Sequence, residues 1–355
     1  MYVQFNNFVY LCKNFFYMKK TCILLIITAF LAISCNYNKQ EKRKANLSGI
    51  DFEVKIERFD KDFWALKESK NQKTDLQKLF EKYPEFAPLY FTYIIELGDD
   101  IDEILEVLPD FFARKDVNEL YLDALKAYDN VSNIEKFITM AFRRMHYFFP
   151  TVPVPKCIME VSGFNFNVIV QENFVALSTD YYLGANYHLY DSIREFYLYQ
   201  RQVMTPKNVA STYVNEWLIS IFPYFSAQDR LLDEIVYQGK ILYITSLLME
   251  EEKIETLIGY TPEQWKWCET YEKDMWQTLI QNKFLFSNDF HLRKKMIEDA
   301  PFTQPFTQAS PGRAGIFVGY RIVESYMQKN ANISPLELML NADAQGILER
   351  SGYQP

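Results

Sequence analysis

An apolar run from Thr21 to Ile33 is the feature that most strongly constrains which part of this 355-residue chain can form a folded domain. Lys19 and Lys20 precede the run, which is shorter than the roughly 20 residues that a membrane-spanning helix needs. Positive charge followed by a short apolar run is typical of a secretory signal peptide. We therefore predict that residues 1–34 are a signal peptide, with Met18 as the true start, and exclude them from the fold.

Cys35 follows the small residues Ala32 and Ser34, as in the cleavage site of bacterial lipoproteins. In such a site the cysteine thiol is diacylated and becomes the mature N-terminus, and two acyl chains give stable anchoring. Leu31 lies one place further upstream than in the usual pattern. An ordinary signal peptide or an uncleaved anchor is the alternative. The prediction is an exported domain held on a membrane through acyl chains on Cys35.

The charge of the folding part restricts its partners. The whole chain has a net charge of −8, and removal of residues 1–34, with three lysines and no acid, lowers it to −11. An acidic surface argues against nucleic acid and against basic contacts with anionic lipid. The residues after Cys35 lack an acidic run that would suggest surface export. We expect the periplasm-facing leaflet of the cell envelope.

Cysteine and histidine are scarce. Beyond Cys35 only Cys157 and Cys268 remain, either as a disulfide, which an exported compartment permits, or as buried apolar side chains. Three histidines are present, and none lies in a cluster with metal-ligand spacing. We predict no metal and no cofactor.

The chain then divides into a polar tether and one domain. Residues 36–48 are polar and rich in lysine, as expected of a tether between lipid and fold. The segment Ile50–Ile56 alternates with period 2, which predicts a strand. Five helices and three strands are predicted next. They are helices Lys73–Lys82, Ala87–Leu97, Ile101–Phe112, Asn118–Ala127 and Ile134–Phe148, then strands Lys156–Val161, Phe166–Val170 and Asn173–Leu177.

The C-terminal half carries helix start signals. Thr261 and Ser334 are each followed by proline and, at the third position, by Gln or Glu, which predicts capping boxes. Ser226 resembles another and would open a helix through Met249, and Ser310-Pro311 would open one to about Met327. The fold class is therefore α+β: a single, mostly helical domain over residues 49–355 with a small mid-chain sheet.

The helix after Ser226 holds the first candidate site. Asp233, Glu234 and Tyr237 occupy the places of His, Glu and His in the zinc-protease pattern H-E-x-x-H. Only the Glu is present, and a neutral Tyr is a poor zinc ligand. The alternative is an amphipathic helix with a charged rim. Lys240 lies on the same helix and completes this set of cleft candidates.

Glycines mark the second candidate. Gly312, Gly315 and Gly319 recur at helical spacing, which predicts close approach of another helix or of a ligand. Arg313 and Glu324, eleven residues apart, would share one face of this helix and either line a cleft or be solvated.

Eight short segments, in this order along the chain, resemble a known family. They are Ile56–Phe63, Tyr83–Phe86, Ser162–Asn165, Leu177–Gly184, Asp233–Tyr243, Gly259–Pro262, Ser310–Arg313 and Asp343–Leu348. Together they resemble the gliding motility lipoprotein GldB family of Bacteroidetes. The resemblance implies an envelope lipoprotein connected in some members with gliding motility. It also implies a zincin-like fold, related to predicted metalloproteases, in which the metal-binding histidines are absent.

Three functions follow as hypotheses. The leading one is a non-catalytic interaction or assembly component of the envelope, because zinc hydrolysis requires a filled set of ligands. The second is a peptide-processing hydrolase with Glu234 as general base and Arg313 as the stabilising charge. The third is a peptide- or glycan-binding lipoprotein.

Overall fold

The mid-chain apolar segments pair into one sheet of the computed structural model, which describes residues 43–355. β2 (Lys156–Glu160) and β4 (Phe174–Ser178) are parallel, with Cys157 opposite Val175. β3 (Val168–Val170) is antiparallel to β4, and β1 (Ile56–Arg58) is parallel to β2. The order β1-β2-β4-β3 confirms the three predicted mid-chain strands and the α+β class.

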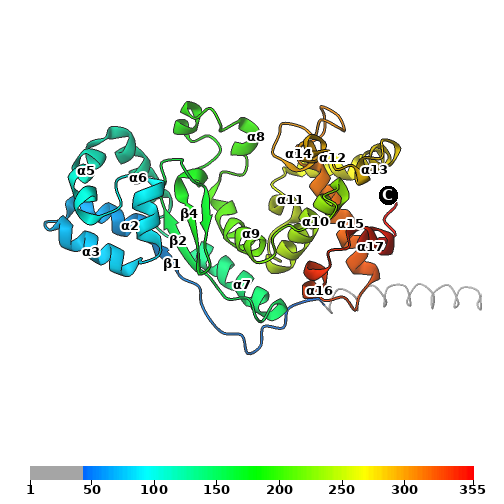
Figure 1. Ribbon diagram of the computed structural model, residues 1–355, viewed down its shortest axis with the longest axis horizontal. Helices are drawn as coiled ribbons and strands as arrows, with labels where there is room; N and C mark the ends of the chain where they lie inside the picture. Colours follow the sequence, from blue (N-terminus) through cyan, green and yellow to red (C-terminus); the bar gives the residue numbers. More distant parts are fainter. Residues whose placement is uncertain (1–42) are drawn as a thin grey trace, which may run out of the picture. The chain divides into compact units, whose positions relative to one another are not determined.

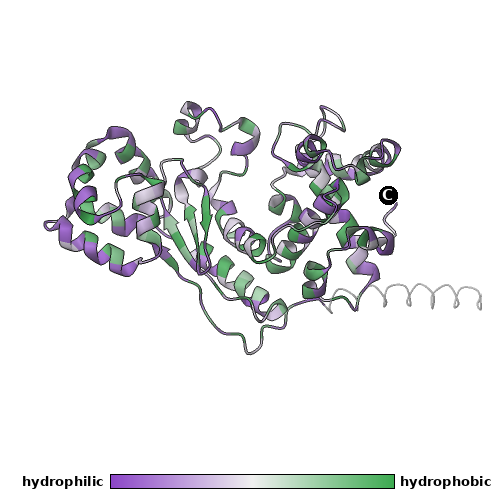
Figure 2. Cartoon of the chain, in the orientation of Figure 1, coloured by the Kyte–Doolittle hydropathy of each residue, from purple (hydrophilic) through white to green (hydrophobic). Residues whose placement is uncertain are grey.

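The sheet is buried on both faces. Cys157 and Val175 pack into a core with the C-terminal helices, whereas their neighbours Ile158 and Ala176 pack into a second core with the N-terminal helices. Because successive side chains of a strand point to opposite faces, two helical layers can cover two fully apolar strands. Figure 1 shows β2 and β4 between these layers, and Figure 2 shows the strands largely in hydrophobic colours.

The predicted strand Ile50–Ile56 is mostly wrong. Its alternating burial is present, since Val54 and Ile56 are buried, Phe52 is partly buried, and Asp51, Glu53 and Lys55 are exposed. Its hydrogen-bond partners, however, are side chains of the helix α7 (Ser132–Phe148). The backbone N–H of Val54 donates to Thr139 Oγ1 and that of Ile56 to a Glu135 carboxylate, each at 3.0 Å. Side chains replace a neighbouring strand, so pairing begins only at Ile56.

The N-terminal layer consists of short helices. Their bounds are α2 (Phe59–Trp64), η1 (Ala65–Glu68), α3 (Gln72–Lys82), α4 (Phe86–Leu89), η2 (Tyr90–Ile94), α5 (Ile101–Ala113) and α6 (Lys115–Ala127). The predicted helix Ala87–Leu97 ends early. Its second half is a π-helical turn that ends at Ile94, and Glu96 has a φ of 52°. A left-handed residue there stops the helix.

The remaining chain forms the second layer. Its elements are η3 (Thr179–Tyr182), η4 (His188–Ser192), α8 (Leu198–Arg201), η5 (Pro206–Asn208), α9 (Val209–Ile221), α10 (Leu231–Leu248), α11 (Ile254–Leu257), α12 (Pro262–Thr270), α13 (Glu272–Gln281), η6 (Phe284–Phe286), α14 (Phe290–Ile297), α15 (Ala314–Lys329), α16 (Pro335–Leu340) and α17 (Ala344–Ser351). Thr261 and Ser334 cap α12 and α16 through capping boxes, as predicted.

Two predicted helix starts are wrong. Ser226 does not cap α10; its Oγ donates to Asp233, and the helix begins five residues later at Leu231. Ser310 does not cap α15 either. Its hydroxyl lies within hydrogen-bonding distance of the carbonyls of Thr303 and Thr307, in the loop before the helix. In both cases the hydroxyl has a partner that a sequence pattern does not reveal.

α10 and α15 share the most extensive contact of the described elements. A Cβ added at Gly319 would overlap the carbonyl oxygen of Ile235, and one added at Gly239 would overlap the backbone of Gly319. Gly315 likewise faces the carbonyl of Met296, at 2.8 Å from the position of an added Cβ. The predicted close approach of a helix is confirmed at Gly315 and Gly319, and the backbones of α10 and α15 touch because neither Gly239 nor Gly319 has a side chain. Gly312 instead precedes α15 and faces the carbonyl of Ala300 in a loop, so its place on the helix was wrongly predicted.

Cys157 and Cys268 are both buried and free, so the disulfide alternative is not realised. Each lies in the core beside apolar neighbours. Both thiols behave as small apolar side chains.

We expect Gly239→Ala to lower the free energy of unfolding by about 1–3 kcal/mol or more, because an extra methyl group is forced into a filled backbone contact. Urea unfolding followed by tryptophan fluorescence measures the change. Gln238→Ala, one position along α10 on a half-exposed side, should change it by less than about 0.5 kcal/mol. Equal effects of the two substitutions would contradict the backbone contact.

Candidate functional site

The candidate residues Asp233 and Glu234 lie in the first turn of α10. Asp233 accepts hydrogen bonds from the backbone N–H of Arg230 and from Ser226 Oγ, both at 2.9 Å. Its other oxygen accepts from Arg230 Nη2 at 2.8 Å. Burial alone would raise the pKa of Asp233, but these bonds from Arg230 and Ser226 lower it below its ordinary value. Asp233 thus takes part in capping the N-terminus of α10, where a negative charge is favourable.

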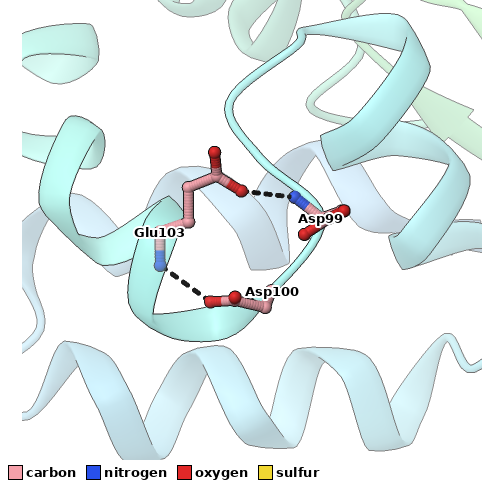
Figure 3. Close-up of side chains that lie close together, drawn as sticks. All are labelled: Asp99, Asp100 and Glu103. Atoms are coloured by element: carbon pink, nitrogen blue, oxygen red, sulfur yellow. Dashed lines mark hydrogen bonds between the residues drawn. The ribbon is translucent and has the colours of Figure 1, made fainter.

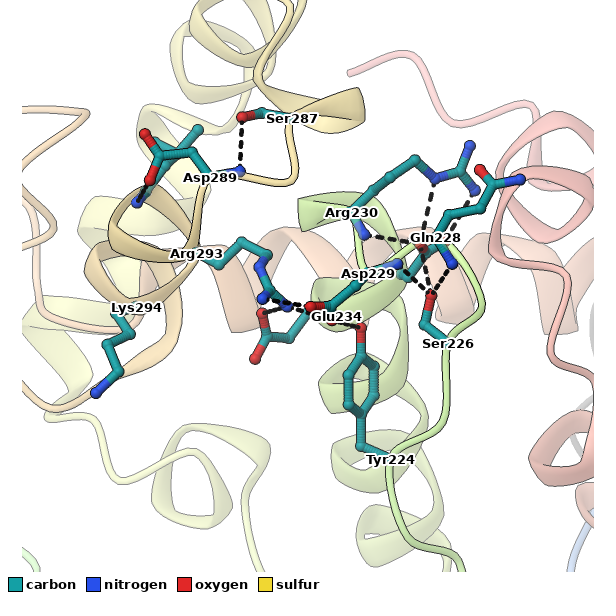
Figure 4. Close-up of polar contacts among 12 residues, drawn as sticks. Tyr224, Ser226, Gln228, Asp229, Arg230, Glu234, Ser287, Asp289, Arg293 and Lys294 are labelled. Atoms are coloured by element: carbon teal, nitrogen blue, oxygen red, sulfur yellow. Dashed lines mark hydrogen bonds and ion pairs between the residues drawn. The ribbon is translucent and has the colours of Figure 1, made fainter.

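Glu234 faces a different neighbour. Arg293, on α14, donates to Glu234 Oε2 at 3.2 Å and through Nη2 to Asp229 at 2.6 Å (Figure 4). The side chain of Glu234 is 18% exposed. Burial raises the pKa of Glu234, and the charge of Arg293 acts against that rise. One guanidinium therefore joins two carboxylates and ties α14 to the start of α10.

The other two candidates on α10 point elsewhere. Tyr237 donates its hydroxyl to the carbonyl of Phe222 at 2.9 Å. Lys240 is buried, donates to the carbonyl of Asn341, and has its pKa lowered to about 8 by that burial. The positions that correspond to the two zinc-binding histidines are thus occupied by side chains whose polar atoms already hold the fold together.

The prediction that Arg313 and Glu324 share one helix face is wrong. Arg313 precedes the first residue of α15 and has a φ of 59°, so it does not lie on the helix face. Its guanidinium donates to the carbonyl of Ile258 and pairs with Asp299 at 3.1 Å. Glu324 instead accepts from Tyr320 and Arg321 on its own helix. The two side chains serve separate contacts.

The histidines are also separate from α10. His188 pairs with Glu119 at 2.9 Å, and His146 lies edge-on to Phe52. His291 is exposed on α14 beside Phe290.

Among residues 43–355 one group of three acids has ligand oxygens within 4.8 Å of one another: Asp99, Asp100 and Glu103, all exposed. Figure 3 shows why they lie together. Asp100 accepts from the N–H of Glu103 at 2.9 Å, and Glu103 accepts from the N–H of Asp99 at 3.0 Å. These bonds cap α5, so a helix start accounts for the group.

A buried carboxyl pair is the feature that the sequence analysis missed. Glu160 ends β2, and Asp180 follows β4 by two residues. Because the two strands are parallel, their carboxyl ends meet at one edge of the sheet, and both side chains are essentially unexposed. A signal was present in the sequence: an acid directly after the apolar run Cys157-Ile158-Met159.

The loop after β2 encloses this pair. The N–H of Phe164 donates to Asp180 at 2.7 Å, and Ser162 donates to the same carboxylate through both its N–H and its hydroxyl at 3.3 Å. Gly163 and Phe164 both have positive φ, which turns the loop back over Asp180. The short segment Ser162–Asn165 thus covers the buried carboxylate of Asp180 and donates hydrogen bonds to it.

Burial changes the ionisation of both acids. It raises the pKa of Asp180 to about 6, against the bonds from Phe164 and Ser162. Burial, with the charge of Asp180, raises the pKa of Glu160 well above its ordinary value. Ser178 donates to one oxygen of Glu160, and the other has no hydrogen-bond partner within the described residues. The pair can hold a proton in the interior near neutral pH, but no substrate can reach it.

We expect the substitution Glu160→Gln to make stability less sensitive to pH. A raised folded-state pKa means that the folded protein binds more protons than the unfolded chain, so stability falls as pH rises above the ordinary value of 4.5. Glutamine does not ionise, so the variant does not lose stability in this way. The repulsion of the Glu160 carboxylate by the charges of Asp180 and Asp60 is removed as well. Urea unfolding at about pH 4.5 and about pH 8 should show the variant gaining stability relative to the parent at the higher pH, on the order of 1 kcal/mol or more.

The exposed residue Glu172 provides the matched control, since Glu172→Gln should leave the pH dependence of the parent unchanged. An equal effect of Glu160→Gln at both pH values would mean that Glu160 has the same pKa in the folded and the unfolded protein, and would contradict the raised pKa.

Comparison with known proteins identifies the family. The chain matches the model of the family described as gliding motility protein GldB over residues 40–355. Neither the curated proteins nor the solved structures contain a match. Within residues 43–355, no helix has the length and apolar character to span a bilayer. Since the match covers nearly the whole chain and confirms the resemblance seen in its segments, the chain belongs to the GldB family of gliding motility lipoproteins.

Proposed function

We propose that this protein is a lipid-anchored envelope component that acts by holding partners rather than by catalysis. Family membership associates it with gliding motility and with a membrane. The observation that carries the non-catalytic part is the use of Asp233 and Tyr237: both polar groups are engaged with the protein's own backbone. A catalytic zinc needs about three protein ligands and an open position. The zincin-like fold that the resemblance implies belongs to the same proposal.

Anchoring is proposed to occur through acyl chains on Cys35. This residue and the predicted signal peptide lie outside the described residues. Residues 43–48, the described end of the predicted tether, contain turns and no helix or strand. Such a tether would let the domain extend into the periplasm from the membrane leaflet that carries the acyl chains. This agrees with the periplasm-facing leaflet that we expect.

The second candidate function is a peptide-processing hydrolase based on Glu234. One observation favours it: the raised pKa of this half-buried carboxyl, as expected of a general base. Against it stands Arg293, which Glu234 shares with Asp229 and which is itself buried. Arg313, proposed as the stabilising charge, pairs with Asp299 instead.

Zinc analysis separates the two functions. We expect the full chain, purified in mild detergent and exposed to zinc, to retain well below one equivalent of metal after buffer exchange. Glu234→Gln should match the parent in metal content and in residual peptidase activity, because the protein does not provide the ligands that a catalytic zinc needs. Asp100→Asn is the control for weak binding to the exposed acids that cap α5.

One tight equivalent of zinc that survives in Asp100→Asn, with a peptidase activity that Glu234→Gln abolishes, would instead make this protein an enzyme with a new set of ligands.

Metabolic labelling tests the anchor. Cells that express the chain and are fed alkyne-palmitate should label it, and Cys35→Ser should remove the label, because only the thiol of Cys35 is expected to carry acyl chains. Cys12→Ser is the matched control, since residues 1–34 are predicted to be removed. Label that persists in Cys35→Ser, or is lost in Cys12→Ser, would contradict the assignment.

A further inference from the structure

The outer edge of β3 has no neighbouring strand among the described residues, since β3 ends the order β1-β2-β4-β3. Just before the strand, the backbone N–H of Ser178 donates to the carbonyl of Asn167 at 2.9 Å. In an antiparallel pair, residues that bond across the pair alternate with residues whose backbone groups point away from it. Asn167 and Ile169 therefore bond to β4, and the N–H and C=O groups of Val168 and Val170 point to the outer edge.

This edge is open to pairing. Within residues 43–355, no backbone or side-chain group forms a hydrogen bond with the outward groups of Val168 and Val170. Both side chains are half-buried, and Phe166, which precedes them on the same face, is 41% exposed. Natural edge strands commonly avoid pairing through charge, proline or a bulge, none of which β3 contains. The strand is short, so its edge offers two donors and two acceptors.

α9 packs beside β3 and carries a carboxylate near its edge. The side chains of Val168 and Val170 face α9, since they contact the core to which this helix contributes. Glu216 lies on α9, one turn after Thr212. Thr212 Oγ1 is 3.3 Å from the hydroxyl of Tyr182. The same hydroxyl is hydrogen-bonded to the side chain that starts β3 and is within range of the charge of Glu216. These shared neighbours bring Glu216 close to the strand.

Glu216 lacks a positive partner. Its side chain is half-buried, and it forms no ion pair within the described part of the chain. Burial raises the pKa of Glu216, against a hydrogen bond from its neighbour Asn215. A carboxylate that has lost water without gaining a cation is in an unfavourable environment. A Lys or Arg that a partner brings to this edge would supply the missing charge.

The same carboxylate argues against a second copy of this chain as the occupant. Antiparallel pairing of two β3 edges would bring two Glu216 side chains to one face of the joined sheet. Like charges on paired strands are destabilising, and the chain as a whole carries a net charge of −8. A basic segment of another protein is therefore the better fit.

We propose that the outer edge of β3 binds an extended, basic segment of a partner protein as an additional antiparallel strand. The backbone of the segment bonds to Val168 and Val170, and its Lys or Arg faces Glu216. Apolar residues two places before and after this cation lie against Phe166 and Val170. Backbone bonds then give affinity, and the side chains give specificity. The inference rests on the proposed function, because it names the surface and the class of partner for a protein that holds partners.

Peptide chemistry allows a test that leaves the protein intact. The probe is N-acetyl-Thr-Val-Thr-Lys-Thr-Val-Thr-amide, titrated into the full chain in detergent and followed by calorimetry. Its two valines and its lysine share one face of an extended strand. We expect saturable binding with a Kd below about 1 mM. Methylation of the lysine backbone nitrogen should weaken binding at least about tenfold, because that N–H points at β3. Methylation of the next nitrogen, whose N–H points away, should not.

Variants assign the interaction to this edge. Glu216→Gln should weaken binding of the lysine peptide about fivefold, and should not weaken binding of an analogue with methionine in place of lysine. Glu269→Gln, an exposed acid on α12, is the matched control and should change neither affinity. Val168→Pro removes one outward N–H at a position where an edge strand tolerates proline, and should weaken binding about tenfold. Circular dichroism checks its fold, and Glu216→Gln tests the edge without altering the backbone.

Absence of saturable binding up to about 10 mM would overturn the proposal. So would equal effects of the two methylations, or full affinity in Glu216→Gln. A dimer in sedimentation that Val168→Pro dissociates would assign the edge to a second copy instead. The zinc and labelling experiments do not involve β3, so failure of the peptide test with those results intact would remove this inference alone.

Discussion

The contact between Gly239 and Gly319 brings the backbones of α10 and α15 together, and the second layer of the domain is arranged around it. Because no side chain separates the two helices there, Ile235 and Val236 are packed into the core from one side and Phe317 and Val318 from the other. α14 joins through the backbone of Met296 opposite Gly315. Mid-helix glycine costs about 1 kcal/mol relative to alanine, which the close packing of three helices offsets.

This packing determines what the start of α10 can do. Asp233 is held as the cap of the helix, and Glu234 is shared through Arg293 with Asp229. The first turn of α10 is therefore a junction between α10, α14 and the preceding loop. The same geometry that would present two histidines to a metal here presents an Asp and a Tyr to the protein's own backbone.

Periodicity predicted the larger elements well because burial imposes it. The mid-chain strands and the helices α3, α5, α6 and α7 follow from apolar spacing, and Thr261 and Ser334 predicted helix starts because a capping box is local chemistry. Predictions failed where the hydrogen-bond partner lies outside the local sequence pattern. The segment before β1 pairs with side chains of α7, and Ser226 binds Asp233 instead of a helix start.

The candidate sites show the same limit. Arg313 was placed on a helix face because a left-handed residue cannot be recognised from spacing. Its partner Asp299 lies near the other end of the same loop between α14 and α15. Glu160 and Asp180 were overlooked because each looks like the polar end of a strand. Only the parallel pairing of β2 with β4 brings them together in the interior.

Native-state hydrogen exchange tests the central claim, that the glycine contact makes α10 and α15 one rigid unit with the first turn of α10 included. The account predicts that amides from Ile235 to Leu242 and from Phe317 to Val323 exchange only through global unfolding, with the same free energy and the same response to low urea. Exchange of the first turns of α10 through a local opening, with α15 still protected, would contradict it and would point to a mobile helix of the kind a catalytic site could use.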